Sequence, residues 1–225
     1  MVAILIGIVA IMPDLGNATI LFLTVVIMIA VSGIGYRWFS TMLGAIVSVS
    51  SLVLASIWVI GVERVAKIPV FGYVAKRFSA FFNPFKDLSG SGHQLANSYY
   101  AMSNGGWFGL GLGNSIEKRG YLPEAHTDFV FSIVIEEFGF FGASLILALL
   151  FFLILRIILV GIRAKNPFNS MMALGIGGMI LMQTFINIGG ISGLIPSTGV
   201  TFPFLSQGGN SLLVLSVAIA LVLNI

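Results

Sequence analysis

Long apolar runs, separated by short polar breaks, dominate this chain of 225 residues. Helical runs are expected at about 1–12, 15–32, 42–62, 139–160, 171–189 and 210–225. Several of them approach or exceed the ~18 residues that carry a helix across a membrane, and they lack the apolar and polar alternation of a transmembrane barrel strand. The pattern predicts an all-α polytopic membrane protein, with a bundle of about six transmembrane helices in a single membrane domain.

The breaks between the runs carry signals of their own. A proline ends the first run, and Asp14 is placed to cap the next helix through the amides of Asn17 and Ala18. The apolar run that begins at Asp128 is longer than one span needs, and Gly139 interrupts it. We therefore expect a short helix at the membrane edge, a bend at Gly139 and then the true span.

Two stretches are too polar or too irregular for a continuous span. Hydropathy falls over about 63–127, which predicts a long extracytoplasmic loop, and the prolines and glycines of 195–212 predict a re-entrant or broken-helix outer face. Short loops set the orientation: Arg37 in one loop, and Arg163 with Lys165 in another, are expected in the cytoplasm. The irregular stretch is expected to fold against the region of Asp128 and to form one outward-facing cavity with it.

Composition agrees with a membrane protein and excludes several functions. Hydrophobic residues make up 58% of the chain and charged residues 8%, with a mean hydropathy of +1.07, whereas roughly a quarter of the residues of soluble domains are charged. The formal net charge of +3 is too small to indicate a nucleic-acid partner. Without cysteine there is no thiolate chemistry, and with only two histidines no protein metal site is expected.

The few acidic residues gather in one place. Five of the eight lie between Trp107 and Glu137, at the edge of an apolar run. Such groups are unfavourable unless they are solvated, paired or lining a cavity, so the cluster is either a functional site or a solvated loop with a helix cap. If a helical turn starts near Pro123, Asp128 lies beyond the capping positions, which favours a catalytic carboxylate with a raised pKa. Glu124 would then interact with the dipole of that first turn.

Other chemistries fit the sequence poorly. His126 lies two residues from Asp128 and on a helix would point away from it, so a serine hydrolase triad is not expected. The glycines within 105–113 lack the spacing of a nucleotide-binding loop. Gln183 and Asn187 lie four residues apart inside a span, where an interhelical hydrogen bond is the favoured interpretation.

Glu136 and Glu137 are adjacent, so they cannot share one face of a helix. Both lie at the start of an apolar run. At least one of them is therefore expected to pair with a basic residue of the loop, such as Lys118 or Arg77.

Six motifs follow one another along the chain: P-D-L-G-N-A, R-F-x-A-F-F-N-P, G-W-F-G-L-G-L-G-N-S, Y-L-P-E-A-H-T-D-F, E-E-F-G-F-F-G and G-V-T-F-P-F-L-S-Q-G-G-N-S-L. Together they resemble the SEDS family, whose branches are the FtsW, RodA and SpoVE proteins. The resemblance covers essentially the whole chain, and Y-L-P-E-A-H-T-D-F with F-L-S-Q-G-G-N-S is most similar to the FtsW branch.

This resemblance implies a peptidoglycan glycosyltransferase that polymerises lipid II during cell division. It would act in the bacterial cell membrane at the division septum, with its active site facing outside, beside a class B penicillin-binding transpeptidase and other divisome membrane proteins. Its motif makes Asp128 the catalytic general base that deprotonates the acceptor sugar. A helping role for a divalent cation, Mg²⁺ or Mn²⁺, stays open, and no nucleotide is expected. The residues expected to contact substrate are Arg77, Lys118, Arg119, Glu124, His126, Thr127, Ser206, Gln207, Asn210 and Ser211.

Members of this family carry further spans before the P-D-L-G segment, so the chain is expected to be a fragment of a larger bundle. Two other functions stay open. A lipid II flippase would need a charged path through the spans, which are almost uncharged away from their ends. A non-catalytic scaffold for the transpeptidase would not need Asp128. Polymerisation of lipid II by the complete protein, with and without Asp128→Asn, separates the three.

Overall fold

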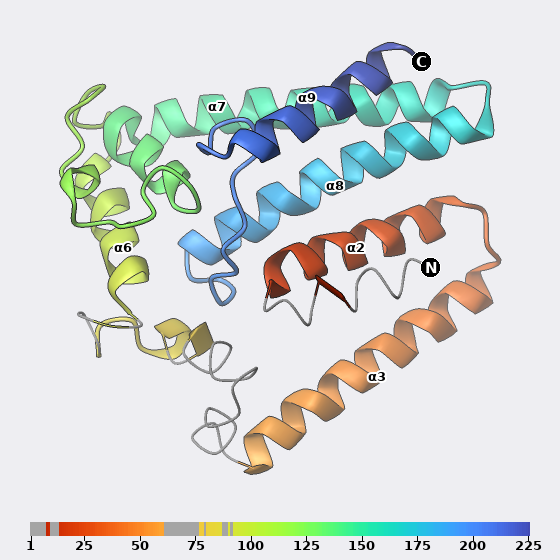
Figure 1. The fold of residues 1–225 in the computed structure, drawn as a ribbon, viewed down its shortest axis with the longest axis horizontal. Helices are drawn as coiled ribbons and strands as arrows, with labels where there is room; N and C mark the ends of the chain where they lie inside the picture. The colour runs from red at the N-terminus through yellow and green to blue at the C-terminus, as the bar shows by residue number, and fades with distance from the viewer. Residues whose placement is uncertain (1–7, 10–13, 61–76, 79, 87–89, 91) are drawn as a thin grey trace.

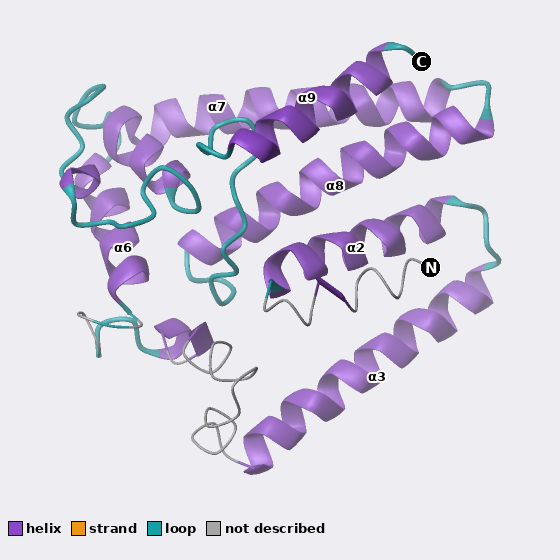
Figure 2. Cartoon of the chain, viewed as in Figure 1, coloured by secondary structure: helices purple, strands orange, loops and turns teal. Residues whose placement is uncertain are grey.

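The computed structural model describes residues 8–9, 14–60, 77–78, 80–86, 90 and 92–225. Every regular element in this part of the chain is helical, which confirms the predicted all-α class (Figure 2). The predicted run 1–12, apart from two residues, and the beginning of the predicted loop, 63–76, lie outside the described residues. The elements are α2 (Leu15–Val31), α3 (Tyr36–Ile60), α6 (His93–Gly105), the 3-10 turn η1 (Glu117–Arg119), α7 (Val130–Arg163), α8 (Pro167–Ile191) and α9 (Gly209–Leu223).

Helix α8 is the centre of the bundle, because it packs against α7 on one side and α2 on the other (Figure 1). Helix α6 packs against α7 at the end where α7 begins. The α2–α3 and α7–α8 turns lie together at one end of the molecule, and the loops before α7 and between α8 and α9 lie at the opposite end (Figure 1). The basic short loops and the irregular stretches are thus separated along the bundle, as the sequence predicts.

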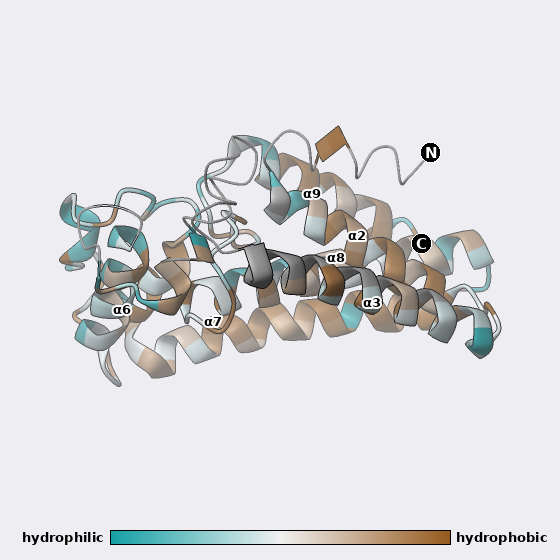
Figure 3. Cartoon of the chain, turned by 90° about the horizontal axis from the view of Figure 1, so that it is seen from below, coloured by the Kyte–Doolittle hydropathy of each residue, from teal (hydrophilic) through white to brown (hydrophobic). Residues whose placement is uncertain are grey.

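The surface of the bundle is that of a polytopic membrane protein. Helices α7 and α8 are 34 and 25 residues long and apolar enough to cross a bilayer. Hydrophobic residues cover the helices along most of their length, and hydrophilic residues concentrate towards the two ends (Figure 3). Leu145, Leu149 and Phe152, spaced as one face of α7, are 64%, 62% and 62% exposed. This apolar face needs a nonaqueous neighbour. Membrane crossing by the other helices stays a prediction.

The predicted bend at Gly139 is confirmed. Gly139 has φ 70° and ψ −177° inside α7, and the loop after α6 enters the gap that this bend opens. The Leu110 amide donates to the Glu136 carbonyl at 2.9 Å, which pairs a carbonyl at the kink. A Cβ atom on Gly139 would lie 2.4 Å from the Gly109 nitrogen, so the close approach of the two backbones requires glycine there.

The start of α2 confirms the predicted cap for Asn17 only, because the Ala18 amide donates to the main-chain carbonyl of Asp14, at 3.1 Å, rather than to its side chain. The Asp14 carboxylate accepts from the Asn17 amide at 3.1 Å and from its side chain at 2.8 Å. A Cβ atom on Gly16 would lie 2.7 Å from the Thr198 carbonyl oxygen, so this first turn packs directly on the segment between α8 and α9. The first turn of α2 therefore lies against the irregular segment between α8 and α9.

One helix boundary was predicted wrongly. The third helix begins at Tyr36 rather than near residue 42, so Arg37 and Trp38 lie in its first turn. The amides of Trp38 and Phe39 both donate to the Gly35 carbonyl, at 2.9 and 3.3 Å. Tyr36 and Trp38, the aromatic residues beside Arg37, suit the membrane interface in a helix as well as in a loop. Their presence therefore did not show where this helix begins.

Candidate active site

A small recess opens where the loop before α7 meets the segment between α8 and α9. Its volume is about 20 Å³, which is enough for a water molecule or a hydroxyl group. Ionisable, amide and apolar side chains line it together with a stretch of backbone. The lining residues are Arg77, Gln94, Asp128, Phe129, Ile186, Asn187, Gly190, Ile191, Ser197, Thr198, Gly199 and Val200.

Three consecutive carbonyl groups, those of residues 126–128, hold the two irregular segments together. In chain order they accept hydrogen bonds from the Gln207 amide at 2.8 Å, the Ser206 hydroxyl at 2.6 Å and the Asn187 side-chain amide at 2.7 Å. Ser206 is buried and also accepts from the Phe202 amide at 2.7 Å. The predicted packing of the irregular stretch against the region of Asp128 is confirmed.

The helical turn predicted from Pro123 is wrong. Residues 121–129 form successive turns, and α7 begins only at Val130. Leu122, Ala125 and Phe129 are buried in the core at a spacing that would also suit a helix. The carbonyls of residues 126–128 are instead bonded to distant segments. Asp128 therefore lies just before α7 rather than inside a helix, and no side chain caps that helix.

The Asp128 carboxylate faces the recess in a partly buried setting. No described residue donates a hydrogen bond to it. Gly199 has φ 77°, and a Cβ atom there would lie 3.3 Å from Asp128 Oδ2 and 3.0 Å from Arg77 Nη2. The Arg77 guanidinium also donates to the Ser197 carbonyl. Glycine at this position lets the backbone approach the carboxylate and the guanidinium at once.

Burial raises the pKa of Asp128 above its ordinary value. The negative charges of Glu124 and, more weakly, Asp14 raise it further, while the positive charge of Arg77 lowers it. A carboxylate with a raised pKa and no hydrogen bond to its oxygens is a stronger proton acceptor than an ordinary surface aspartate. The site thus suits general base catalysis.

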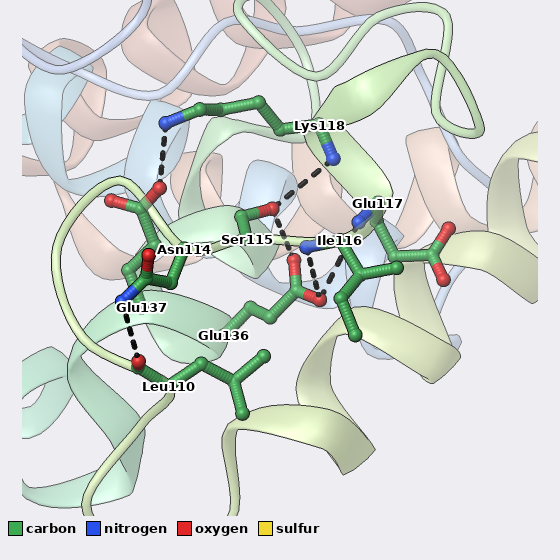
Figure 4. Close-up of polar contacts among 8 residues, drawn as sticks. All are labelled: Leu110, Asn114, Ser115, Ile116, Glu117, Lys118, Glu136 and Glu137. Carbon is green, nitrogen blue, oxygen red and sulfur yellow. Dashed lines mark hydrogen bonds and ion pairs between the residues drawn. The ribbon is translucent and has the colours of Figure 1, made fainter.

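A second polar cluster ties the loop before α7 to the first part of that helix (Figure 4). Glu136 is fully buried and accepts from the Ser115 hydroxyl, the Ile116 amide at 3.1 Å and the Asn104 side chain at 3.3 Å. Lys118 reaches the neighbouring Glu137, with Nζ 2.6 Å from Oε1. The prediction that one of the two glutamates pairs with a loop cation is confirmed.

Glu117 is a further buried carboxylate, in η1, outside the lining of the recess. Burial raises its pKa, the charge of Glu136 adds to this, and His93 opposes it. Its Oε2 atom has no hydrogen-bond partner among the described residues. Glu117 thus resembles Asp128 in its electrostatics but not in its position.

The structure disperses the remaining residues expected at the substrate. Arg77 and Asp128 alone line the recess, while Lys118 is paired with Glu137. Thr127 donates to the exposed Glu124 at 2.6 Å. The hydroxyl of Ser206 is occupied by two backbone groups. Contact of these residues with substrate stays a prediction. Outside the lining of the recess, four of the predicted residues are exposed and one is half-buried: Arg119, His126, Gln207 and Asn210 are exposed, and Ser211 is half-buried.

Only Arg77 and Asp128 of the residues that line the recess were predicted from the sequence as site residues. Among the others, Gln94 lies on α6, Gly199 lies in the irregular stretch, and Asn187 lies in α8. Asn187 and Gln183 do not form the predicted interhelical bond. Gln183 donates to the Thr201 carbonyl at 3.0 Å, and Asn187 donates to the carbonyls of residues 128 and 200. Amides in an apolar helix were a usable signal, but only the fold identifies their partners.

Known proteins are similar to this chain in sequence. A family model described as "Cell cycle protein", for FtsW, RodA and SpoVE, matches residues 1–225. A Lactococcus lactis protein named "Probable peptidoglycan glycosyltransferase FtsW" is 56% identical over 215 residues, which are 96% of this chain and 51% of that protein. "Stage V sporulation protein E" of Bacillus subtilis is 42% identical over 213 residues, covering 95% of this chain and 54% of that protein. The chain spans about half the length of the curated relatives it matches.

The fold also matches a solved structure. The TM-score is 0.71 at 25% sequence identity, over 97% of this chain and 58% of the other. That structure was described under the heading "Structural coordination of polymerization and crosslinking by a peptidoglycan synthase complex". The similarity therefore extends to three dimensions over nearly all of this chain.

Proposed function

Because this chain belongs to the family of FtsW, RodA and SpoVE proteins, we propose that it forms part of a peptidoglycan glycosyltransferase that polymerises lipid II during cell division. The observation that carries the proposal is Asp128. Its carboxylate lies in a recess between two irregular segments, where burial raises its pKa and no described residue donates a hydrogen bond to it.

In this reaction Asp128 acts as the general base. It accepts the proton of the acceptor sugar's 4-hydroxyl as that oxygen forms a bond to the anomeric carbon of the lipid-linked donor. The bond between the anomeric carbon and the diphosphate oxygen breaks, and its electron pair leaves with undecaprenyl diphosphate. The recess of about 20 Å³ is large enough to admit the hydroxyl.

Positive charge near the base is suited to the leaving group. Arg77 is the cation beside Asp128, and it can stabilise the charge that develops on the diphosphate. No three His, Asp or Glu side chains of the described residues are grouped to hold a metal ion. A divalent cation would accordingly arrive through the diphosphate oxygens, which is the usual mode of Mg²⁺.

The orientation of the protein in the membrane follows from the basic residues at its short loops. The recess lies at the end opposite the α2–α3 and α7–α8 turns, which carry Arg37, Arg163 and Lys165. With these cations in the cytoplasm, the recess faces outside. A class B penicillin-binding transpeptidase at the septum is the proposed partner, and the matched structure of a complex for polymerization and crosslinking supports it.

The test is polymerisation of lipid II by the complete purified protein together with its transpeptidase partner. Because a positioned general base contributes about 10²- to 10⁴-fold, Asp128→Asn should lower the rate by that factor and leave membrane insertion and partner binding intact. Glu117→Gln is the matched control: it neutralises another buried carboxylate that does not line the recess, and it should keep the wild-type rate.

A near-normal rate in well-folded Asp128→Asn protein would refute the base assignment. Failure of the wild-type complex to polymerise lipid II, combined with transport of lipid II across a vesicle membrane, would support a flippase instead. Failure of both activities would leave a scaffold for the transpeptidase.

A further inference from the structure

Asn187 is the point at which α8 holds both sides of the recess. Its side-chain nitrogen donates at 2.7 Å to the Asp128 carbonyl and at 2.6 Å to the Val200 carbonyl. Residues 128 and 200 belong to the two irregular segments, which also bond directly through Gln207 and Ser206 to the carbonyls of residues 126 and 127. At residue 128 the link is one buried amide, which joins the backbone of Asp128 to the backbone of residue 200.

The orientation of this amide is determined by its partners. A carboxamide nitrogen carries two hydrogens, and here both are used by carbonyl oxygens. The flipped orientation would place Asn187 Oδ1 against two carbonyl oxygens, which is repulsive. In the observed orientation Oδ1 is buried and has no hydrogen-bond partner among the described residues.

The Asn187 Oδ1 atom, which has no hydrogen-bond partner among the described residues, bears on the role of this residue. A buried polar atom without a hydrogen bond lowers stability, and such atoms in native structures call for an explanation, a catalytic role among them. An apolar residue would remove this unpaired acceptor but would leave the carbonyls of residues 128 and 200 without their donor. The two donors are what only an amide of this length supplies, and one of them acts on Asp128 itself.

We propose that Asn187 is a positioning residue for the proton transfer, acting through the backbone of Asp128 to hold the carboxylate at the mouth of the recess. This inference rests on the proposed function, because it presumes that Asp128 is the base. Asn187 acts on the Asp128 main chain and accepts or donates no proton in the reaction.

The chain offers a matched control one turn earlier on the same helix. Gln183 donates to the Thr201 carbonyl at 3.0 Å and to the Thr201 hydroxyl at 3.3 Å, and it makes no contact with Asp128. Gln183→Ala thus loosens the segment between α8 and α9 without releasing the base. Asn187→Ala loosens the same segment and releases the base as well.

The experiment measures lipid II polymerisation by the complete protein with its partner, for Asn187→Ala, Gln183→Ala and wild type. A displacement of about 1 Å in a catalytic group costs up to about 10²-fold in rate, so Asn187→Ala should lower kcat by ~10- to 100-fold with KM changed less than about twofold. Gln183→Ala should keep kcat. Equal losses in the two variants, or a wild-type kcat in Asn187→Ala, would overturn the proposal.

The pH profile gives a readout that a merely structural role would not move. Release of Asp128 towards water should lower its pKa, so the acidic limb of kcat/KM should shift to lower pH in Asn187→Ala and not in Gln183→Ala. The charged groups that face Asp128 are Glu124 in its own loop, Arg77 and Asp14, and all three are unchanged in both variants. An unshifted limb in Asn187→Ala argues against positioning.

A double variant separates this inference from the function on which it rests. If Asn187 acts only through Asp128, then Asn187→Ala should reduce the residual rate of Asp128→Asn no further. A fully active Asp128→Asn protein refutes the base, whereas an inactive Asp128→Asn with a fully active Asn187→Ala refutes only the positioning role. Should Asn187→Ala fail to insert, Asn187→Ser keeps one donor in a small side chain and faces the same kcat criterion. Failure of both to insert assigns Asn187 a structural role and overturns the proposal.

Discussion

Replacement of Lys118 by methionine tests whether this cation serves the substrate or the fold. Its Nζ atom lies 2.6 Å from Glu137 Oε1, and the two side chains are 34% and 7% exposed. Methionine keeps the apolar length of lysine and removes the charge. The family resemblance placed Lys118 among the residues expected to contact substrate, whereas in the structure it pairs with a carboxylate on α7.

The expected loss of stability follows from these exposures. Removal of one partner from a buried ion pair costs about 3–5 kcal/mol, because the other charge is left buried and unpaired. The lysine is one-third exposed, so water screens part of this interaction, and exposed pairs contribute only ~0.2–1 kcal/mol. We therefore expect Lys118→Met to destabilise the protein by about 1–3 kcal/mol, between these two limits. Glu137→Gln in the same chain should remove most of that loss, because no charge then remains unpaired.

The assay is thermal unfolding of the complete protein in lipid nanodiscs, with polymerisation of lipid II measured in parallel. Each kcal/mol should shift the midpoint by only about 1–2 °C, because the complete protein is expected to be about twice the length of this chain. The double variant should recover both the midpoint and most of the activity lost in Lys118→Met. If the midpoint recovers but polymerisation does not, Lys118 is needed by the substrate, and the reasoning that makes it a tie between loop and helix is refuted.

Two further predictions concern the orientation and the carboxylate. Cysteine at Ser192, which is exposed beyond the end of α8, should react with an impermeant maleimide in intact cells, and cysteine at Arg163 should not; the reverse labelling would invert the topology. Asp128→Asn should be more stable than wild type at pH 7–8, because a raised folded-state pKa means that ionisation opposes folding. The stability difference should be lost as the pH falls below the ordinary aspartate value of about 4, where both states are protonated. An Asn variant less stable than wild type at pH 8 would instead make Asp128 a structural ion-pair partner.

Signals that act within a few residues predicted much of the fold. The Asp14 cap depends on an amide three residues away, and the bend at Gly139 depends on a conformation that glycine adopts readily. Pro123 is the instructive failure. It begins a plausible first helical turn, but the following nine residues include buried apolar anchors and carbonyls that are bonded to distant segments. Local propensity lost to tertiary contacts there.

The sequence also did not show that the adjacent residues Glu136 and Glu137 have different kinds of partner. At least one of Glu136 and Glu137 was expected to pair with a loop cation, and Glu137 does so. Glu136 is fully buried, and a hydroxyl, a side-chain amide and backbone amides of the loop satisfy it instead. Donors of this kind are present in any loop, so composition cannot indicate which carboxylate they will serve.

The recess itself depends on a contact that no local pattern encodes. Irregular backbone near a membrane leaves carbonyls without helical partners, and these must find donors within the protein. The donor for the Asp128 carbonyl comes from Asn187, 59 residues further along the chain. An amide within an apolar helix could equally bind another helix, which is why the sequence alone favoured that pairing. Once α7 and α8 pack side by side, the freed carbonyl at the start of α7 faces the amide on α8. The packing of the two helices thus determines where Asp128 is held, and the amide that bonds to the broken backbone is the one that we propose positions the base.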